Sequence, residues 1–375
     1  MRFAAAGACL TTKHSQSRRA RVCARQISLP PESIPSMSTP IEKMRNIAII
    51  AHVDHGKTTL VDELLKQSGT FRENEKTAER MMDSNDLEKE RGITILAKTT
   101  SVEWKDYRIN IVDTPGHADF GGEVERILQM VDGAIVLVDA AEGPMPQTKF
   151  VVSKALKVGL RPIVAVNKID KPERRPDEVI NEVFDLFANL DASDDQLDFP
   201  ILYGSAKQGW MNIEYENQTE NMDSLFQMVV DHVPVPKVEE GPFRFLATTI
   251  SSDPFLGRIL TGRVSSGTIK PNQSIKVLNR DGELVEQTRV SKVLAFRGLD
   301  RVPVDEAQAG DIVSLAGTTK ANVADTFCDP SVSEPIEAQP IDPPTISMTF
   351  RVNDSPLAGT EGTKVTSRMI WDRLL

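Results

Sequence analysis

The segment from Ile47 to Leu65 limits the possible folds of this chain more than any other feature. An apolar run at 47–50 is followed by the octapeptide AHVDHGKT at 51–58 and then by a helical pattern from Thr59. A strand, a tight loop and a helix in this order form a phosphate-binding loop, because backbone N–H groups at the start of the helix point at a bound anion. The segment therefore predicts a nucleotide-binding α/β domain.

The loop also carries the side chains that phosphate and Mg²⁺ need. We expect Lys57 to reach the β- and γ-phosphates and the Thr58 hydroxyl to bind Mg²⁺. Ala51 replaces the first glycine usual in this pattern, so its position requires a negative φ or open space. His52 and His55 are expected to be structural. A chance match within an ordinary strand, turn and helix is the alternative, which the flanking elements disfavour. The loop residues predicted to contact the nucleotide are Asp54, His55, Gly56, Lys57, Thr58 and Thr59.

A second apolar strand, at 108–112, ends in the tetrapeptide DTPG at 113–116. We expect the Asp113 carboxylate to hold Mg²⁺ from the end of that strand. Gly116 has no side chain, so its N–H can approach a γ-phosphate closely. On its own this tetrapeptide is more often a plain turn. Its place downstream of the phosphate-binding loop favours the nucleotide site.

A third buried strand, at 162–166, precedes Asn167, Lys168 and Asp170. One carboxylate can accept both the N1–H and the exocyclic amine of guanine, donors that adenine lacks, so Asp170 predicts guanine as the base. We expect Asn167 to tie neighbouring loops together and the Lys168 stem to lie over the ring. A simple turn at a strand end is the alternative. A last motif supplies Ser205 and Ala206, whose backbone N–H groups would meet the guanine oxygen, and Lys207.

Together these motifs resemble those of the translational GTPases, the class of elongation factors G and Tu. The resemblance includes RGIT at 91–94, which lies in a stretch similar to the first switch region of these GTPases. It also includes DTPGH at 113–117, in which the histidine after the glycine is typical of the class. Three longer stretches, at 116–126, 141–151 and 343–350, resemble the BipA/TypA subfamily. The resemblance covers about residues 44–375.

The resemblance implies roles for further residues. Thr94 would bind Mg²⁺ and the γ-phosphate, and His117 would orient the attacking water once the ribosome places it. With Lys57, these two would be the catalytic residues. Val53 and Ile93 would form an apolar gate beside His117. A surface His117 that caps the following helix is the alternative, and no arginine finger can be assigned from the sequence.

Two architectures follow one another along the chain. Residues 41–236 alternate strand-length apolar runs with helical stretches at 176–190 and 221–232, which predicts an α/β P-loop GTPase domain with a mostly parallel sheet and helices on both faces. Residues 237–335 follow a stiff Val-Pro-Val-Pro linker and carry short strands without helices, which predicts a small closed β-barrel. Its strands are predicted at 245–251, 257–265, 274–279, 284–296 and 310–316, with a hairpin turn at Asp281-Gly282.

Residues 336–375 predict one strand at 345–352 and the start of a helix at 367. A strand and part of a helix cannot bury a core. In relatives this segment opens an α+β ferredoxin-like domain, so we expect a truncated gene product or gene model.

The first 40 residues differ from the rest in charge. They contain six basic residues and one acidic residue, Glu32, so their net charge is +5. The whole chain has a net charge of −10, so the remaining residues carry −15. A basic, Ser-containing, acid-poor start without an apolar core predicts an organelle transit peptide, and the arginines at 18–21 favour the mitochondrion over the chloroplast. A disordered extension without an address, and hence a cytoplasmic protein, is the alternative.

Composition narrows the partners. No run of about 18 apolar residues occurs, so we expect no membrane-spanning helix. The acidic body argues against a diffuse basic surface for DNA, although it leaves room for a local patch that faces RNA. Cys9, Cys23 and Cys328 have neither a CxxC spacing nor a histidine cluster, so the sequence supports neither zinc nor a disulfide framework. We expect a monomer.

The sequence therefore predicts an Mg²⁺-dependent GTPase that hydrolyses GTP to GDP and phosphate and acts in translation or ribosome assembly on a bacterial-type ribosome. Two alternatives stay open. One is a GTP-dependent scaffold with little hydrolysis, and the other is an NTPase that does not act on the ribosome. The strands directly after the first domain count against the second of these.

Overall fold

The computed structural model describes residues 39–69, 96–115, 121–338, 346–360 and 366–374. The stretch Pro35–Leu375 forms one compact unit, and two sheets make up its core. Within the described part of the chain, no helix is both long and apolar enough to cross a membrane.

The first sheet has seven strands in the order β2-β3-β1-β4-β5-β6-β7. The strands from β3 to β6 in this order run parallel, whereas β2 and β7 pair antiparallel at the two edges. Parallel strands end at one edge of a sheet, and open α/β sheets bind ligands there. The strands are β1 (Met44–Ala51), β2 (Lys98–Trp104), β3 (Tyr107–Asp113), β4 (Gly133–Asp139), β5 (Arg161–Asn167), β6 (Ile201–Ser205) and β7 (Trp210–Asn212).

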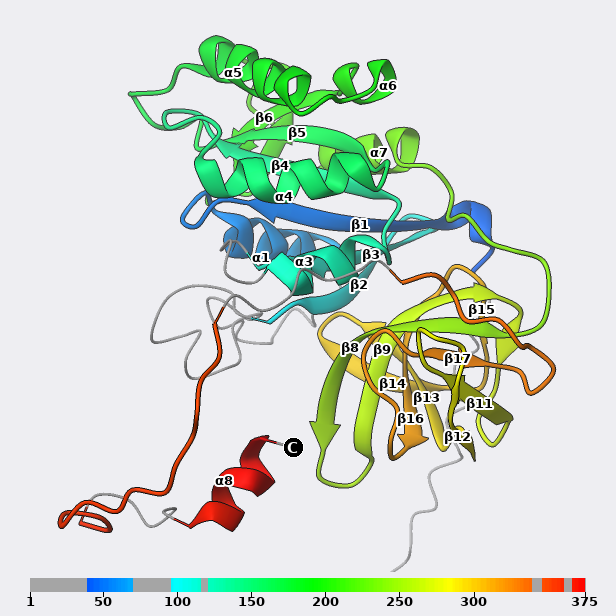
Figure 1. Ribbon diagram of the computed structural model, residues 1–375. Helices are drawn as coiled ribbons and strands as arrows, with labels where there is room; N and C mark the ends of the chain where they lie inside the picture. The colour runs from blue at the N-terminus through cyan, green and yellow to red at the C-terminus, as the bar shows by residue number, and fades with distance from the viewer. Residues whose placement is uncertain (1–38, 70–95, 116–120, 339–345, 361–365, 375) are drawn as a thin grey trace, which may run out of the picture. The chain divides into compact units, whose positions relative to one another are not determined.

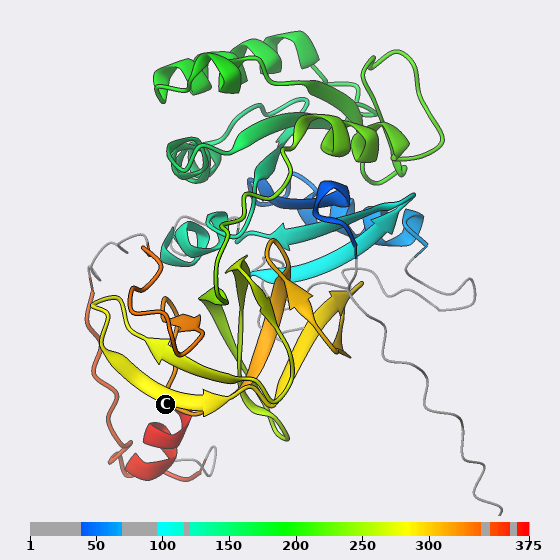
Figure 2. The same cartoon turned by 90° about the vertical axis from the view of Figure 1, so that its right-hand side faces the viewer.

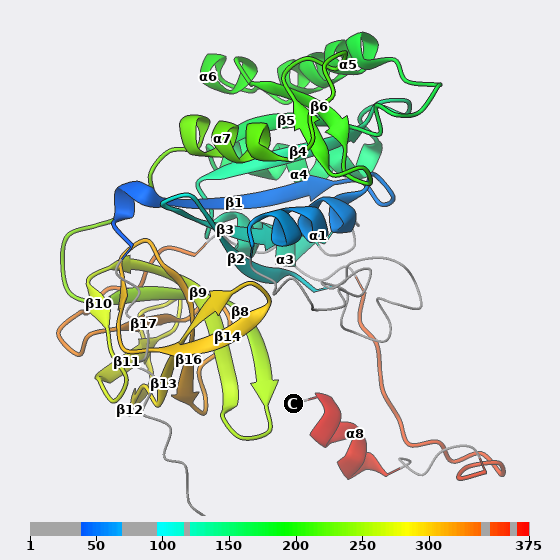
Figure 3. The same cartoon turned by 180° about the vertical axis from the view of Figure 1, so that it is seen from behind.

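Helices cover both faces of this sheet because its buried strands are apolar on both sides. Along β1, Ile47 and Ile49 belong to one hydrophobic cluster, and Ala48 and Ile50 belong to the other. The first cluster includes α1 (Lys57–Gln67) and α7 (Asp223–His232). The second includes α3 (Gly121–Leu128), α4 (Pro146–Lys157) and α5 (Pro176–Asn189), with the short α6 (Asp194–Leu197) beside α5. Figure 1 has the second layer in front and Figure 3 the first, and Figure 2 shows helices on opposite sides of the sheet.

The first domain forms as the sequence predicts. The helices expected at 176–190 and 221–232 are α5 and α7, and each differs from its expected bounds by two residues or fewer. Prolines mark the starts of α4 and α5, where a missing N–H costs nothing. The predicted mostly parallel sheet with helices on both faces is confirmed.

The second sheet has eight antiparallel strands in the order β12-β11-β17-β8-β9-β16-β13-β14 and curls around one apolar cluster. No ladder joins its edge strands β12 and β14 among the described residues, so we describe the sheet as barrel-like. A short ladder of β10 (Thr268–Ile269) and β15 (Ala307–Gln308) accompanies it. The eight strands are β8 (Arg244–Asp253), β9 (Gly257–Ser266), β11 (Ser274–Leu278), β12 (Leu284–Arg289), β13 (Lys292–Arg297), β14 (Asp300–Val304), β16 (Ile312–Thr318) and β17 (Thr326–Cys328).

Two strand predictions after residue 280 are wrong. The stretch 284–296, expected to be one strand, is divided between β12 and β13, because β12 pairs with β11 whereas β13 pairs with β14 and β16. The strand expected at 345–352 does not form over its described residues 346–352. An apolar face along that segment stays exposed at Ile346, Met348, Phe350 and Val352. The hairpin at Asp281-Gly282 is confirmed, and a helix, α8, spans Ser367–Leu374.

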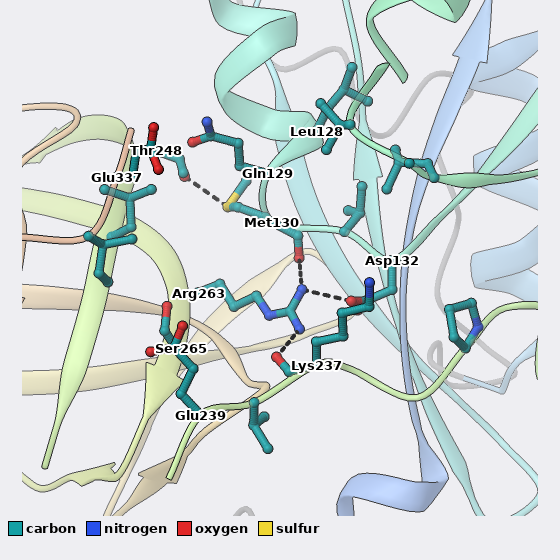
Figure 4. A pocket seen from close by; sticks show the side chains of 18 of the residues that line it. Leu128, Gln129, Met130, Asp132, Lys237, Glu239, Thr248, Arg263, Ser265 and Glu337 are labelled. Carbon is teal, nitrogen blue, oxygen red and sulfur yellow. Dashed lines mark hydrogen bonds and ion pairs between the residues drawn. The ribbon is translucent and has the colours of Figure 1, made fainter. Parts of the chain in front are cut away.

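Polar contacts join the domain of the first sheet to the domain of the second. The Arg263 guanidinium of β9 donates to Asp132 Oδ1 at 2.9 Å, to the Lys237 carbonyl at 2.7 Å and to the Met130 carbonyl at 3.4 Å (Figure 4). Thr248 of β8 donates to the Met130 sulfur at 2.8 Å. A cavity of about 520 Å³ opens beside these contacts. The loop after α3 is therefore fixed to the barrel-like sheet.

Candidate nucleotide-binding site

The loop between β1 and α1 has the backbone of a phosphate cradle. Gly56 has a φ of 92°, and a Cβ there would lie 2.5 Å from the Asn167 side-chain nitrogen. Glycine is thus needed both for the left-handed backbone and for the close approach. Ala51 is the last residue of β1 and has no positive φ, as expected for Ala in place of Gly. No side chain of a described residue caps the start of α1, where backbone N–H groups favour an anion.

Lys57 and Asp113 meet at the centre of the site. The Lys57 ammonium lies 2.7 Å from Asp113 Oδ1 and also donates to the Thr114 carbonyl. Asp113 is fully buried at the end of β3, and Thr114 is held by its hydroxyl to the Ile49 carbonyl of β1 at 2.7 Å. The structure therefore brings together the cation predicted for the phosphates and the carboxylate predicted for the metal.

The donor set here fits Mg²⁺. Asp113 Oδ2 is buried and makes no hydrogen bond with any described residue, and no described residue bonds the half-buried Thr58 hydroxyl. Mg²⁺ in phosphate sites takes one or two carboxylates and completes its shell with phosphate oxygens and water. Thr58 and Asp113 would hold the ion, which when bound supplies positive charge to the β- and γ-phosphate oxygens.

Asn167 at the end of β5 ties two loops together. Its side-chain NH₂ donates to the His55 carbonyl of the phosphate-binding loop at 2.8 Å, and its Oδ1 accepts the Ala206 N–H at 2.8 Å. The predicted tie between neighbouring loops is thus present in the geometry. The Ala206 N–H, expected to face the guanine oxygen, is instead engaged by Asn167.

The remaining residues predicted to bind the base lie around this tie. Asp170 is exposed in the turn after β5, and no described residue bonds its carboxylate. Lys168 has a φ of 64° and its ammonium lies 2.6 Å from Asp139 Oδ2. Ser205 is buried and its hydroxyl accepts the Gln208 N–H at 3.3 Å, whereas Lys207 is exposed.

Sequence reasoning missed Asp139. It ends β4 next to Asn167 in the parallel ladder, just as Asp113 ends β3. The signal was present as an Asp directly after a buried apolar strand. It could be read only once the order of the strands was known.

The two loop histidines differ in environment. His55 is fully buried, and burial first and the neighbouring His52 second lower its pKa, so the imidazole is neutral near neutral pH. Its Nε2 lies 3.4 Å from Glu142 Oε2. Neither ring nitrogen makes a hydrogen bond with a described residue, so the structural role expected for His55 stays a prediction. The other predicted loop residues, Asp54 and Thr59, are exposed, and Asp54 has a φ of 63°.

Several predicted residues lie outside the described part of the chain: Ile93, Thr94, Gly116 and His117. Of the proposed apolar gate, only the half-buried Val53 is described. The roles assigned to Ile93, Thr94, Gly116, His117 and Val53 stay predictions.

Comparisons with known proteins agree with this geometry. Residues 42–235 match the family described as the elongation factor Tu GTP binding domain, and residues 257–328 match elongation factor Tu domain 2. A protein of Escherichia coli strain K12 called "Large ribosomal subunit assembly factor BipA" is 56% identical over 335 residues, covering 89% of this chain and 55% of that protein. Proteins of the same description in Salmonella typhimurium and Buchnera aphidicola are 55% and 52% identical, over 89% of this chain and 55% and 54% of theirs.

The chain spans about half the length of these curated relatives. The first matched family alone covers more than half of the chain, and the identity to the relatives extends across both sheets. The chain therefore belongs to the BipA/TypA family of translational GTPases.

Proposed function

We propose that this chain binds GTP with Mg²⁺ and hydrolyses it to GDP and phosphate. Water attacks the γ-phosphorus, a new P–O bond forms, the bond from the γ-phosphorus to the bridging oxygen breaks, and the proton of the water is released. Lys57 would bind the phosphates, Thr58 and Asp113 would hold the metal, and the predicted roles of Thr94 and His117 would complete the reaction.

The tie made by Asn167 carries this proposal. It brings the phosphate-binding loop and the Ala206 loop together near the turn that carries the exposed Asp170 carboxylate. A carboxylate in that position can accept both donors of a guanine edge, and a site built for those donors rejects a base that lacks them. The phosphates would then lie at the start of α1, whose N–H groups no side chain of a described residue caps.

Competition titration tests the choice of base. Labelled GDP should be displaced by GTP and GDP and not by ATP at comparable concentrations. Displacement by ATP with similar affinity would contradict the assignment of Asp170. A single-turnover assay then separates a GTPase from a scaffold, because a scaffold would retain GTP without releasing phosphate.

We propose further that the partner is a bacterial-type ribosome. A monomer of this chain would bind it during assembly of the large subunit. The relatives are described as large ribosomal subunit assembly factors, and the match to them covers 89% of this chain, including both matched domains. Sedimentation with bacterial-type ribosomes in the presence of a non-hydrolysable GTP analogue tests it. A chain that stays in the supernatant with GTP analogue and with GDP alike would contradict a ribosomal role.

The basic start of the chain supports a proposal about location. Residues 1 to 40 carry +5 with a single acid, which suits import into an organelle, with the mitochondrion preferred. Residues 1–45 fused to a fluorescent reporter should direct it to that organelle. A reporter that stays diffuse in the cytosol would defeat this proposal and leave the nucleotide site untouched.

A further inference from the structure

Asp139 is a fully buried carboxylate that lies outside the motifs from which the sequence predicts the nucleotide site. Its Oδ2 lies 2.6 Å from the Lys168 ammonium and 3.6 Å from the Lys171 ammonium. Its Oδ1 accepts the Ala141 N–H at 2.8 Å and the Glu142 N–H at 3.4 Å. One oxygen therefore orients the loop after β4, and the other faces the lysine predicted to lie over the base.

The charge state of Asp139 follows from these partners. Burial alone would raise its pKa, but the hydrogen bond from Lys168, the Ala141 N–H and the charges of both lysines outweigh burial and hold the pKa below its ordinary value. The carboxylate is thus ionised at neutral pH. An ion pair at 2.6 Å to a fully buried carboxylate fixes the position of its partner more firmly than an exposed ion pair does.

The loop that carries Asp139 is itself held in place. The Arg175 backbone N–H donates to the Ala140 carbonyl at 2.8 Å, and the Arg175 side chain donates to the Ala141 carbonyl at 2.9 Å. Arg175 also pairs with Glu182 of α5. Asp139 is therefore anchored independently of Lys168, as a positioning group must be.

Lys168 is fixed at both ends by this arrangement. Its backbone has a φ of 64° in the turn after β5, where Asn167 and Asp139 are partners in the parallel ladder. Its side chain is 22% exposed, and the stem runs from the turn to the ammonium beside the Asp139 carboxylate. A stem held in this way presents a preformed apolar surface and loses little freedom when a ring covers it.

We propose that Asp139 is a positioning residue for the nucleotide, which anchors the Lys168 ammonium so that the lysine stem packs flat against the base. This rests on the proposed function, because it takes the base to lie beside Asp170. Packing against a ring does not read the edge of the base. Asp139 thus strengthens binding of every nucleotide that the site accepts, whereas Asp170 selects among them.

The test compares the dissociation constants of GDP, inosine diphosphate and xanthosine diphosphate for the full chain and for Asp139→Asn. The variant places an NH₂ group against the Lys168 ammonium and releases the stem. We expect all three nucleotides to bind more weakly by one common factor, roughly 10- to 100-fold, on the scale of a lost contact to a charged group. A change in the ratio between the nucleotides would overturn the proposal.

Asp132→Asn is the matched control. Asp132 is also a buried aspartate, it immediately precedes β4 at the other end of the same strand, and it pairs with Arg263 at 2.9 Å. Loss of this ion pair in Asp132→Asn should reduce thermal stability without changing the three dissociation constants. Equal weakening in both variants would show a general loss of structure and would overturn the positioning role.

Lys168→Met supplies the second measurement and serves also if Asp139→Asn fails to fold. It removes the anchored ammonium and leaves Asp139 paired with Lys171. We expect the same factor of weakening as in Asp139→Asn, and no further weakening in the double variant. Unchanged affinity in Lys168→Met, or additive losses, would overturn the proposal. Failure of the unmodified chain to bind any of the three nucleotides would instead contradict the proposed function.

Discussion

The Arg108 guanidinium lies 3.4 Å from the Asp311 carboxylate, and both side chains are buried where β3 meets the barrel-like sheet. Asn46 makes a parallel contact from β1, because its NH₂ donates to the Gly310 carbonyl at 3.0 Å. These two strands end in Asp113 and in the phosphate-binding loop. The strands that carry the candidate site are therefore fixed to the second domain at their opposite ends.

Asp311 should make stability depend on pH. Burial raises its pKa to about 6, against the smaller opposing effects of the Gln308 N–H and of Arg108. The folded chain then holds this proton more tightly than the unfolded chain does. Its contribution to folding is fully present below the ordinary pKa of 3.8 and is lost as the pH rises through about 6. The loss amounts to about 3 kcal/mol in the free energy of unfolding.

Denaturant unfolding of the chain and of Asp311→Asn, at a series of pH values, measures this effect. Other carboxylates impose their own trends, so the difference between the two proteins is the relevant quantity. Asparagine can still accept the Gln308 N–H but does not titrate. We expect the difference to shift by about 3 kcal/mol between roughly pH 4 and pH 7 in favour of the variant. A difference that does not change with pH would contradict the raised pKa of the buried Asp311 carboxyl.

Gly56→Ala should damage the phosphate-binding loop beyond the cost of backbone strain. A Cβ there would lie 2.5 Å from Asn167 Nδ2, and moving Asn167 would break its bonds to the His55 carbonyl and the Ala206 N–H. We expect a loss of stability of roughly 2–4 kcal/mol from strain and a broken buried network, together with loss of GDP binding. Thermal unfolding and titration with labelled GDP measure both.

Gly159→Ala provides the comparison for that variant. Gly159 has a similar φ of 82° after α4, but a Cβ added there would have no atom of the described residues within 4 Å. The substitution should cost only about 1–2 kcal/mol, the strain of a left-handed alanine, and leave GDP affinity unchanged. If the two variants lost the same stability and GDP affinity, the close approach of Gly56 to Asn167 would not explain the effect of Gly56→Ala.

The sequence allowed most of the first domain to be predicted because its motifs stand at the ends of strands. Each apolar run that precedes Asp113 or Asn167 is long enough to be a buried strand, and parallel strands end at one edge of the sheet. The partners of those residues were harder to foresee. Asp139 could be connected with Lys168 only once the register of β4 against β5 was known.

The second domain was predicted less completely for a related reason. The stretch 284–296 contains no Gly or Pro that would mark the end of a strand, so the change of partner between β12 and β13 was not predicted from the sequence. The alternation at 346–352 indicates a strand, yet no described strand pairs with it. The Arg108 and Asp311 contact spans 203 positions and has no local signal.

Asp170→Asn should change the preferred base. The substitution replaces one accepting oxygen with a donor, which suits the oxygen that xanthine carries where guanine has its amine. We expect GDP affinity to fall by up to about 10⁴-fold and xanthosine diphosphate to become the preferred ligand. Competition titrations with both nucleotides measure the ratio. Unchanged selectivity would remove Asp170 from the base site.

Lys57 and His117 should separate binding from chemistry. Lys57→Ala removes the cation beside the phosphates, so GTP affinity should fall roughly 10- to 100-fold. It also leaves the buried Asp113 without its ion pair, so the melting temperature should fall. His117→Ala should leave affinity nearly intact, because its predicted partner is the attacking water, and slow ribosome-stimulated hydrolysis by about 10²- to 10⁴-fold.

Equilibrium titration and single-turnover hydrolysis with saturating ribosomes distinguish these outcomes. His52→Ala is a suitable comparison, since His52 is a half-buried loop histidine with no predicted part in the reaction. It should change neither affinity nor rate by more than a few-fold, on the scale of a lost surface contact. Equal loss of affinity in the Lys57 and His117 variants would mean that both side chains bind the nucleotide. That result would contradict the water-orienting role predicted for His117.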